Sequence, residues 1–412
     1  MGLVSGGLNG RRFRITTQLP PQFRDVYLES VRSQAFVPAP DAADNEPHFG
    51  WVDVFEAANS EFELNTFLFD RFLVLALRTD KKTVNGRYLK IALAERIAAV
   101  CELRAVEKLS KDEIADVQEA LESELFARAL PSVSTMDIVW DIHTGEVVVF
   151  GTSDTALERI CAYFEETFDV RLRPERQCDW VAEKYDWAEI ISRVEKYVPD
   201  ARGGYGTGGV VDGWREDDPF EGADVELASD FLTWLWIQSE SADGHFRVIE
   251  GVRDTLVEDH ADDEWNDVTE SLKHADLTLW LESKLKLQDI SELEKPDTTI
   301  LLGVAPSTTA AARNGMTAGK RPVEARLGLK LNDLECGLTI SATGAGVSVG
   351  GLKLPFEVKK GQEEKIYERM LLLDLVHSTL KKLYQQFFLD RTSDVWERKI
   401  EAWLNDSELA AK

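Results

Sequence analysis

The hydrophobic pattern between residues 67 and 173 predicts an unbroken series of strands and helices. Apolar residues recur at helical spacing over 89–100 and again over 114–125, which predicts two amphipathic helices. Ser110 and Glu113 have the spacing of a capping box, so the second helix is predicted to begin at this point.

Strands are predicted on both sides of these helices. An apolar segment at 72–77 indicates a buried strand before them, and Pro131 marks the end of the second helix. Residues 136–141 and 146–150 then read as two strands around a His-Thr-Gly turn. A third helix, capped by Ser153 or Asp154, is followed by a short strand at 170–173.

The same signals organise the rest of the chain. The segment at 227–236 is strongly apolar and fits either a helix or a buried strand, of which the helix is favoured. Strands and helices do not alternate regularly, so the prediction is an α+β fold with mixed sheets and flanking helices. The further elements are a strand at 12–19, helices at 21–33, 187–197, 362–390 and 394–404, and strands at 298–302, 325–331, 336–341 and 346–353.

Several sequence pieces, in this order along the chain, resemble the recombination-associated RdgC family. No single piece is a catalytic signature, and their shared order carries the likeness. The pieces are Gly50-Trp51-Val52, the run from Leu77-Arg78-Thr79-Asp80-Lys81-Lys82 to Arg171-Leu172-Arg173-Pro174, Phe231–Trp236, Ala318-Gly319-Lys320, Ala325–Leu329 and Gly351–Leu354.

The resemblance implies a ring-forming homodimer that encircles duplex DNA without sequence preference and restrains RecA-driven strand exchange. Arg78 and Lys82 match the family at a strand end, and Arg128 matches an arginine near the helix tip, so these three are implied DNA contacts. Leu130 and Pro131 beside that tip are implied contacts that close the dimer. The implied location is the cytoplasm, in association with the nucleoid.

Six segments are predicted. Residues 67–176 form the arm, and two acidic insertions interrupt the chain between the arm and residue 298. The segments are 1–66, the arm at 67–176, the insertion at 177–230, a central segment at 231–256, the insertion at 257–297, and a β-rich segment with the last helices at 298–412.

The formal net charge of −27 opposes binding to a phosphate backbone, but the acidity is local. Residues 1–110 are neutral overall, residues 301–412 carry +2, and residues 177–300 carry −20. Each insertion is net −9. The insertions are interpreted either as solvated outer surface, or as a docking surface or an electrostatic fence against DNA. If they only decorate the outside, deleting one should leave the fold intact; otherwise Trp187, Trp214, Trp265 or Trp280 belongs to the core.

Two groups of basic residues are candidates for DNA contact, although an ordinary solvated rim would also explain each of them. For the first group, contacts to the phosphate backbone are favoured over base reading. The first group is Arg78, Lys81, Lys82, Arg87 and Lys90, with Arg128 on the following helix; the second is Arg313, Lys320, Arg321, Arg326 and Lys330.

The sequence offers no support for catalysis, a cofactor or a metal. The glycine spacing before Lys320 does not fit a phosphate-binding loop, and the six histidines show no metal spacing. The four cysteines are scattered, and those at 101 and 161 are predicted to be buried thiols on helix faces. No apolar run is long enough to span a membrane. The rival interpretation is a protein-interaction module whose acidic surfaces bind a basic partner without DNA.

Overall fold

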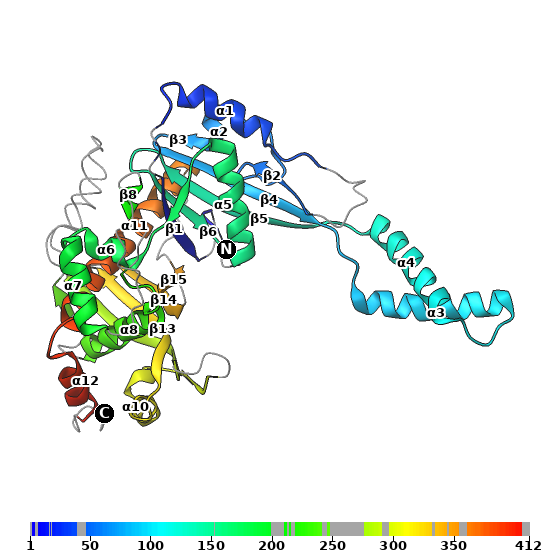
Figure 1. The fold of residues 1–412 in the computed structure, drawn as a ribbon. Helices are drawn as coiled ribbons and strands as arrows, with labels where there is room; N and C mark the ends of the chain where they lie inside the picture. Colours follow the sequence, from blue (N-terminus) through cyan, green and yellow to red (C-terminus); the bar gives the residue numbers. More distant parts are fainter. Residues whose placement is uncertain are drawn as a thin grey trace. The chain divides into compact units, whose positions relative to one another are not determined.

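The computed structural model divides into two compact units, drawn in Figure 1. Unit 1 comprises residues 1–18, 144–153 and 171–412, and unit 2 comprises residues 19–143 and 154–170. Both contain helices and antiparallel sheets, which confirms the predicted α+β class. The residues described are 2–4, 7–15, 17, 19–38, 47–151, 153–198, 210–211, 214–215, 219–240, 245–247, 276–290, 296–331, 334–343, 346–353 and 361–405.

Unit 2 is built on the antiparallel strands β2 (His48–Val52), β4 (Phe72–Lys81) and β5 (Ser132–Asp141). The central strand β4 is buried over Phe72–Leu77, as its unbroken apolar run predicts, and the short strand β3 (Leu68–Phe69) turns into it. Three helices accompany these strands: α1 (Phe23–Ser33), α2 (Leu64–Phe67) and α5 (Asp154–Phe168).

Aromatic packing closes the core of unit 2. The ring of Trp140 on β5 lies 5.6 Å from Phe164 and 5.8 Å from Phe168, both on α5. Trp51 on β2 is fully buried, and its indole nitrogen donates a hydrogen bond of 2.9 Å to the hydroxyl of Thr167. These contacts attach α5 to the sheet through side chains that are distant in sequence.

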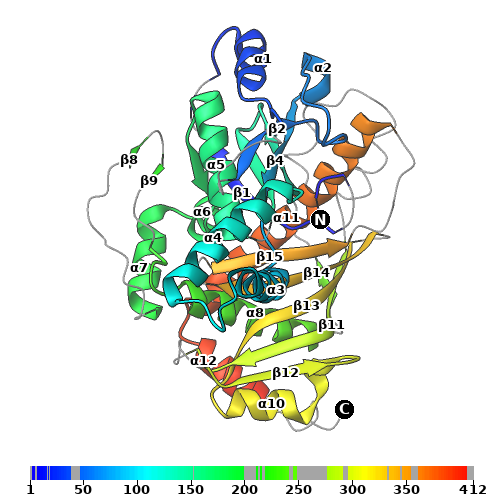
Figure 2. The same cartoon turned by 90° about the vertical axis from the view of Figure 1, so that its right-hand side faces the viewer.

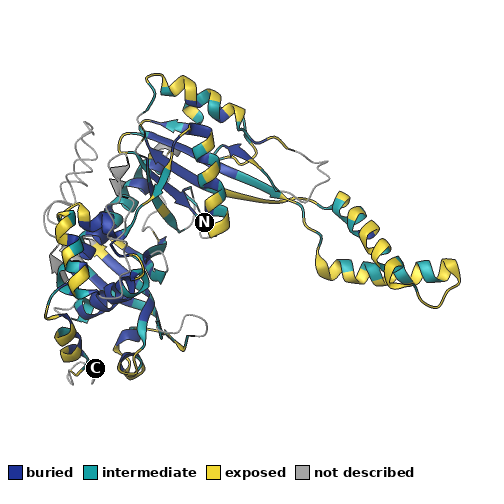
Figure 3. Cartoon of the chain, viewed as in Figure 1, coloured by how far each residue is buried: buried dark blue, intermediate teal, exposed yellow. Residues whose placement is uncertain are grey.

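Two long helices, α3 (Gly86–Arg104) and α4 (Lys111–Arg128), form an antiparallel hairpin between β4 and β5. The predicted capping box is confirmed, because Ser110 accepts a hydrogen bond from the Glu113 backbone and Glu113 accepts one from the Ser110 backbone. Figure 3 colours nearly the whole hairpin as exposed or intermediate, and Leu121 is the one buried residue of its two helices.

Unit 1 contains two larger antiparallel groups of strands. In the first, β1 (Gly10–Ile15) lies between β6 (Glu146–Phe150) and β7 (Leu172–Pro174). The second is a six-stranded sheet in which β11 pairs with β10, β12 and β13, and β14 and β15 follow. Its strands are β10 (His245–Arg247), β11 (Asp276–Gln288), β12 (Thr298–Leu302), β13 (Arg321–Leu331), β14 (Leu334–Thr343) and β15 (Gly346–Lys353).

Helices supply the remainder of the unit 1 core. Helix α8 (Asp224–Glu240) packs against β11, β13, β14 and β15, and all of its side chains from Leu227 to Ile237 are buried. The favoured helical interpretation of 227–236 is therefore confirmed. The other elements are α6 (Gln177–Ala182), α7 (Trp187–Tyr197), the two-stranded pair β8 (Val210–Val211) and β9 (Trp214–Arg215), the 3-10 turn η2 (Pro306–Thr308), α10 (Ala310–Thr317), α11 (Gln362–Arg391) and α12 (Trp396–Leu404).

The two acidic segments are not external decoration throughout, and that interpretation is wrong for the parts described. Trp180 and Val181 on α6, with Ile190 on α7, are buried in unit 1. Strand β11 lies inside the six-stranded sheet, with Leu285 and Leu287 fully buried. Trp187 and Trp280 are half-buried, and Trp265 lies outside the described residues. Both segments thus mix an acidic exterior with side chains that the core requires.

Two smaller predictions also have an outcome. Cys101 and Cys161 are half-buried instead of buried, whereas Cys178 and Cys336 are buried, and all four thiols are free. Among the described helices, none combines the length and the apolar character that a membrane span needs.

Candidate nucleic-acid interface

The first basic group lies where β4 continues into the α3–α4 hairpin. Asn85 caps α3, because its side chain accepts hydrogen bonds from the backbone nitrogens of Arg87, at 3.0 Å, and Tyr88, at 3.2 Å. The cap fixes the start of the helix, so Arg87 falls in its first turn and Lys90 one turn later. The side chains of Arg87 and Lys90 are exposed.

The antiparallel hairpin brings the end of α4 back to the beginning of α3. Lys81 at the end of β4 is the register partner of Ser132 at the start of β5. The ammonium group of Lys82 lies 5.8 Å from the centre of the Phe126 ring on α4. The junction of β4 and β5 with the two helices, here called the hairpin base, therefore gathers basic residues from both chain directions.

This topology corrects the placement of Arg128, Leu130 and Pro131, which were expected near the helix tip. Arg128 ends the last turn of α4, and Leu130 and Pro131 follow it. All three lie at the hairpin base, because β5 must begin there to pair with β4. The turn between the helices is the actual tip. Leu103 at the end of α3 has an exposed fraction of 87%, and Val106 just after the helix has one of 43%. Leu130 is itself 88% exposed, so it is available for a contact, but from the base.

Arg78 is committed to contacts within unit 2. Its guanidinium donates two hydrogen bonds to the carboxylate of Asp80, at 2.8 and 2.7 Å, and a third to the carbonyl oxygen of Ala57 at 3.1 Å. It also lies 4.3 Å from the ring centre of Phe36. The hydrogen bonds to Asp80 raise the pKa of Arg78 and neutralise its charge locally.

Arg128 has an acidic neighbour but keeps its side chain in solvent. It lies 3.1 Å from Glu124, one turn earlier on α4, and its side chain is 75% exposed. Glu124 also accepts a hydrogen bond of 2.8 Å from Arg96 on α3, and this bond, ahead of the nearby positive charges, lowers the pKa of Glu124. An exposed pair of this kind is weak, so a phosphate group can compete for the guanidinium.

Three cations at or near the hairpin base are therefore the most available ones. Lys81, Arg87 and Lys90 are exposed, and none forms an ion pair within the described part of the chain. Their side chains can approach a phosphate without first breaking an internal contact. Their role in DNA binding stays a prediction, as does that of Lys82.

Most of the second basic group is engaged in the interior of unit 1. Arg313 is buried and donates hydrogen bonds to Glu240, at 2.7 Å, and to the carbonyl oxygen of Trp403, at 2.8 Å. Lys320 lies 2.8 Å from Asp297 and 2.8 Å from the hydroxyl of Thr299.

The remaining members of this group differ in exposure. Arg326 lies 3.1 Å from Glu282, and Arg321 is half-buried. Lys330 alone in this group is exposed. The contiguous cationic surface suggested by the sequence thus reduces to one free side chain.

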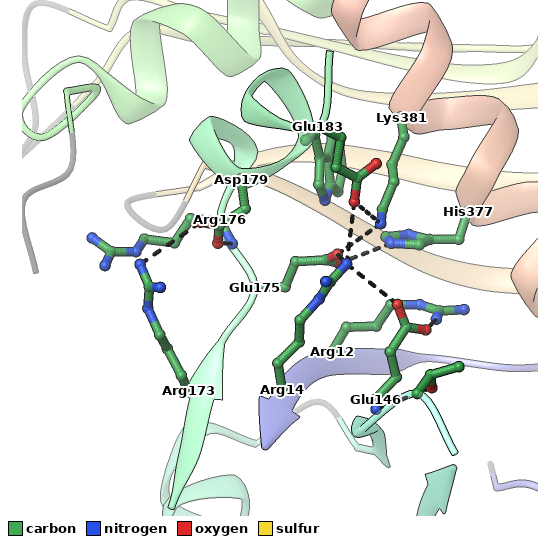
Figure 4. A network of polar contacts seen from close by, with 12 residues as sticks. Arg12, Arg14, Glu146, Arg173, Glu175, Arg176, Asp179, Glu183, His377 and Lys381 are labelled. Carbon is green, nitrogen blue, oxygen red and sulfur yellow. Dashed lines mark hydrogen bonds and ion pairs between the residues drawn. The ribbon is translucent and has the colours of Figure 1, made fainter. Parts of the chain in front are cut away.

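The densest cluster of charges was not identified from the sequence. It lies within unit 1 and joins β1, β6, the segment after β7, and α11, as Figure 4 shows. Arg12 lies 3.1 Å from Glu146 and 2.5 Å from Asp374, while Lys381 lies 3.0 Å from Glu175. The imidazole Nε2 of His377 lies 2.8 Å from Glu175.

Burial decides the protonation of this cluster. It lowers the pKa of His377 to about 4, and the nearby charge of Arg12 acts in the same direction. Burial alone would raise the pKa of Glu175, but His377, Lys381 and Arg12 outweigh it and hold that pKa well below its usual range. At neutral pH the pair is therefore a neutral imidazole beside a carboxylate. This arrangement anchors α11 to β1 and β6.

No group of three or more His, Cys, Asp or Glu side chains among the described residues is placed to hold a metal ion. The sequence could not have indicated the buried cluster, since its members come from residues 12, 146, 175 and 377. The sequence held one indication of it: either Val376 or His377 could occupy the apolar face of α11. Both side chains are buried or nearly so.

Comparison with known proteins gives one result for part of the chain. A family model described as "RdgC: Putative exonuclease, RdgC" matches residues 9–176, which contain the hairpin base and the strands around it. The pieces of the resemblance after residue 176 lie outside this match. No curated protein matches the sequence. The family match supports membership of this chain in the RdgC family.

Proposed function

We propose that this chain binds duplex DNA without sequence preference, through phosphate contacts at the hairpin base. The observation that carries the proposal is the set of exposed cations Lys81, Arg87 and Lys90, which form no ion pair within the described residues. Phosphate contacts supply affinity and carry no direct sequence information. The family match, which covers this region, supports a role associated with recombination.

We further propose that two copies form a ring around the duplex and restrain RecA-driven strand exchange. Support comes from the RdgC resemblance and from Leu130, which presents an apolar side chain at the hairpin base. Helix α11 offers less support for the dimer contact, because it packs much of its surface inside unit 1, with Leu380, Tyr384 and Phe387 buried. The proposal assigns no catalytic step to the chain, and incubation of labelled DNA with the protein and Mg²⁺ should leave the DNA intact.

A pair of charge-matched variants tests the DNA interface. Arg87→Ala/Lys90→Ala removes two cations near the hairpin base, and Lys108→Ala/Lys111→Ala removes two exposed cations at the hairpin tip. Each lost phosphate contact should reduce the slope of log affinity against log salt by about 0.9, so the first variant should lower it by about 2. The second should bind duplex DNA like the wild type. Equal weakening by both variants would show a diffuse charge effect and refute the assigned interface.

Light scattering tests the ring dimer. The wild type should be a dimer at micromolar concentration, and Leu130→Ser should shift it toward the monomer. Leu103→Ser is the matched control, because Leu103 is 87% exposed and Leu130 is 88% exposed. A monomeric wild type would contradict the ring, and dimer loss in the Leu103 variant alone would move the contact to the tip.

A further inference from the structure

Within the described residues, α8 covers one face of the six-stranded sheet of unit 1, and the opposite face is here called the open face. On the covered face, Leu327, Leu329 and Leu338 are fully buried beneath α8. Side chains alternate along a strand, so Arg326, Gly328 and Lys330 point to the opposite face. Figure 2 shows the sheet from the side of this open face, with α8 behind it.

One row of register partners crosses the open face. It begins at Trp280 on β11, passes through Gly328 on β13 and Gly337 on β14, and ends at Lys353 on β15. Four strands at about 4.8 Å spacing make this row about 14 Å long. The two central positions carry no side chain, which leaves a shallow floor between an indole and an ammonium group.

The indole of Trp280 lies flat on this floor. A Cβ atom added to Gly328 would come within 2.1 Å of Cε2 and 2.2 Å of Cζ2 of that ring, so the ring rests directly on the glycine. One ring face is thus against the sheet and the other is turned away from it. Trp280 is half-buried, in keeping with one covered face.

Trp280 also differs from three tryptophans of the core. The indole nitrogens of Trp51, Trp234 and Trp236 donate hydrogen bonds to Thr167, Asp390 and Glu240, respectively. Within the described residues, Trp280 has no hydrogen bond and no ring contact. Its indole nitrogen is also not one of the buried polar atoms that lack a hydrogen-bond partner. The contact with Gly328 explains the position of one ring face. It does not explain why the other ring face is turned away from the sheet.

A second planar group lies beside the indole. A Cβ atom on Gly337 would come within 2.5 Å of a guanidinium nitrogen of Arg326, so this guanidinium covers the second glycine. It is held in place by Glu282, at 3.1 Å, and by the carbonyl oxygen of Gly351, at 2.9 Å. The guanidinium plane is therefore fixed before any ligand arrives.

Unpaired cations border this platform. Lys330 is two residues from Gly328 on the same strand, and Lys353 ends the row; both are exposed, and neither forms an ion pair within the described residues. The acids of this face are partly neutralised, since Glu282 binds Arg326 and Glu324 lies 2.5 Å from Lys284. Glu335, the register partner of Lys330, is the exposed exception.

We propose that this platform, defined as Trp280, Arg326, Lys330 and Lys353, binds single-stranded nucleic acid by stacking an unpaired base on the indole. Aromatic and guanidinium planes are the usual stacking surfaces for unpaired bases, and lysines beside them meet the phosphates. A duplex keeps its bases stacked inside the helix, so it cannot use the free face of Trp280. The platform lies in unit 1 and is separate from the hairpin base, and the choice of nucleic acid as ligand rests on the proposed function.

The test uses the full chain and fluorescence anisotropy with three probes of equal length: labelled oligo-dT, the same phosphate chain with abasic sites, and a duplex. The wild type should bind oligo-dT at least about fivefold more tightly than the abasic chain, since stacking is worth roughly 1–3 kcal/mol per base. Trp280→Ala should lose about 5- to 150-fold in affinity for oligo-dT by the same measure. Trp280→Phe should retain most of it, and duplex binding should not change in either variant.

The outcomes separate this proposal from the proposed function. Equal affinity of the wild type for oligo-dT and the abasic chain would overturn stacking without the use of any variant, even if duplex binding is intact. Stacking that depends on Trp280, in a protein that does not bind duplex, would support the platform and refute the hairpin-base interface. The thermal midpoint of each variant shows whether Trp280→Ala is folded. If it is not, the Trp280→Phe variant and the abasic comparison decide the question.

Discussion

His377 and Glu175 form a buried contact in unit 1, with 2.8 Å between the imidazole Nε2 and a carboxylate oxygen. The pair joins α11 to the segment after β7, and Lys381 reaches the same carboxylate from one turn further along α11. Because the pair is enclosed, its protonation is coupled to the stability of the fold.

The free energy of unfolding should fall as the pH decreases from 6.5 toward 4. Burial lowers the pKa of His377 from 6.5 to about 4, so in this interval the unfolded chain binds more protons than the folded one. The stabilisation is complete above pH 6.5, and about 3 kcal/mol is lost by pH 4. Glu175, whose pKa is lowered, adds a further loss below its ordinary pKa of 4.5.

Urea unfolding of three proteins at a series of pH values measures this effect. His377→Gln should be less stable at pH 7 and should show a smaller pH slope between 6.5 and 4.5. His143→Gln, at an exposed turn position, should keep the slope of the wild type. An unchanged slope in the His377 variant would show that another group is responsible.

The segment at 177–198 should be essential for stability in spite of its acidic composition. Trp180 is 4% exposed and packs its ring 5.6 Å from Tyr384 on α11. Trp180→Ala should therefore cost about 3–5 kcal/mol in the free energy of unfolding. Glu195→Ala, at an exposed position of α7, should change it by less than about 0.5 kcal/mol. A Trp180 variant as stable as the wild type would restore the interpretation of this segment as decoration.

Gly50 should not tolerate a side chain. A Cβ atom there would lie 2.5 Å from the Cα atom and 2.7 Å from the nitrogen of Phe36, so the backbone itself would have to move. Gly50→Ala should lower the free energy of unfolding by about 1–3 kcal/mol in chemical denaturation. At Gly86, in the first turn of α3, a Cβ meets nothing within 4 Å, and Gly86→Ala should be neutral or slightly stabilising. The reverse order of the two variants would refute this account of Gly50.

Local signals in the sequence predicted most elements, because each depends on neighbouring residues. The capping box at Ser110 and Glu113 fixed the start of α4, and the amphipathic pattern over 187–197 gave the bounds of α7. Burial of charged segments was not predictable in this way. The acidic composition of 177–198 hid the fact that Trp180 and Ile190 point to one interior.

The candidate site was predicted less well, for a physical reason. Whether a cation is free depends on partners that are distant in sequence: Lys320 meets Asp297, and Arg326 meets Glu282. The position of Arg128 depends on the direction of α4, which the helical pattern alone does not show. Lys81, Arg87 and Lys90, which the sequence offers as candidates for DNA contact, are exposed and no distant carboxylate reaches them within the described residues. Their contact with DNA stays a prediction.

The salt dependence of duplex binding by the wild type tests the central claim most directly. The chain carries a net charge of −27, so any affinity must come from local cations. We predict a dissociation constant in or below the range of roughly 10⁻⁴–10⁻⁶ M at physiological salt, equal for unrelated duplex sequences and rising steeply with salt. An affinity that is independent of salt, or no duplex binding at either low or physiological salt, would contradict it and favour an interaction module that acts without DNA.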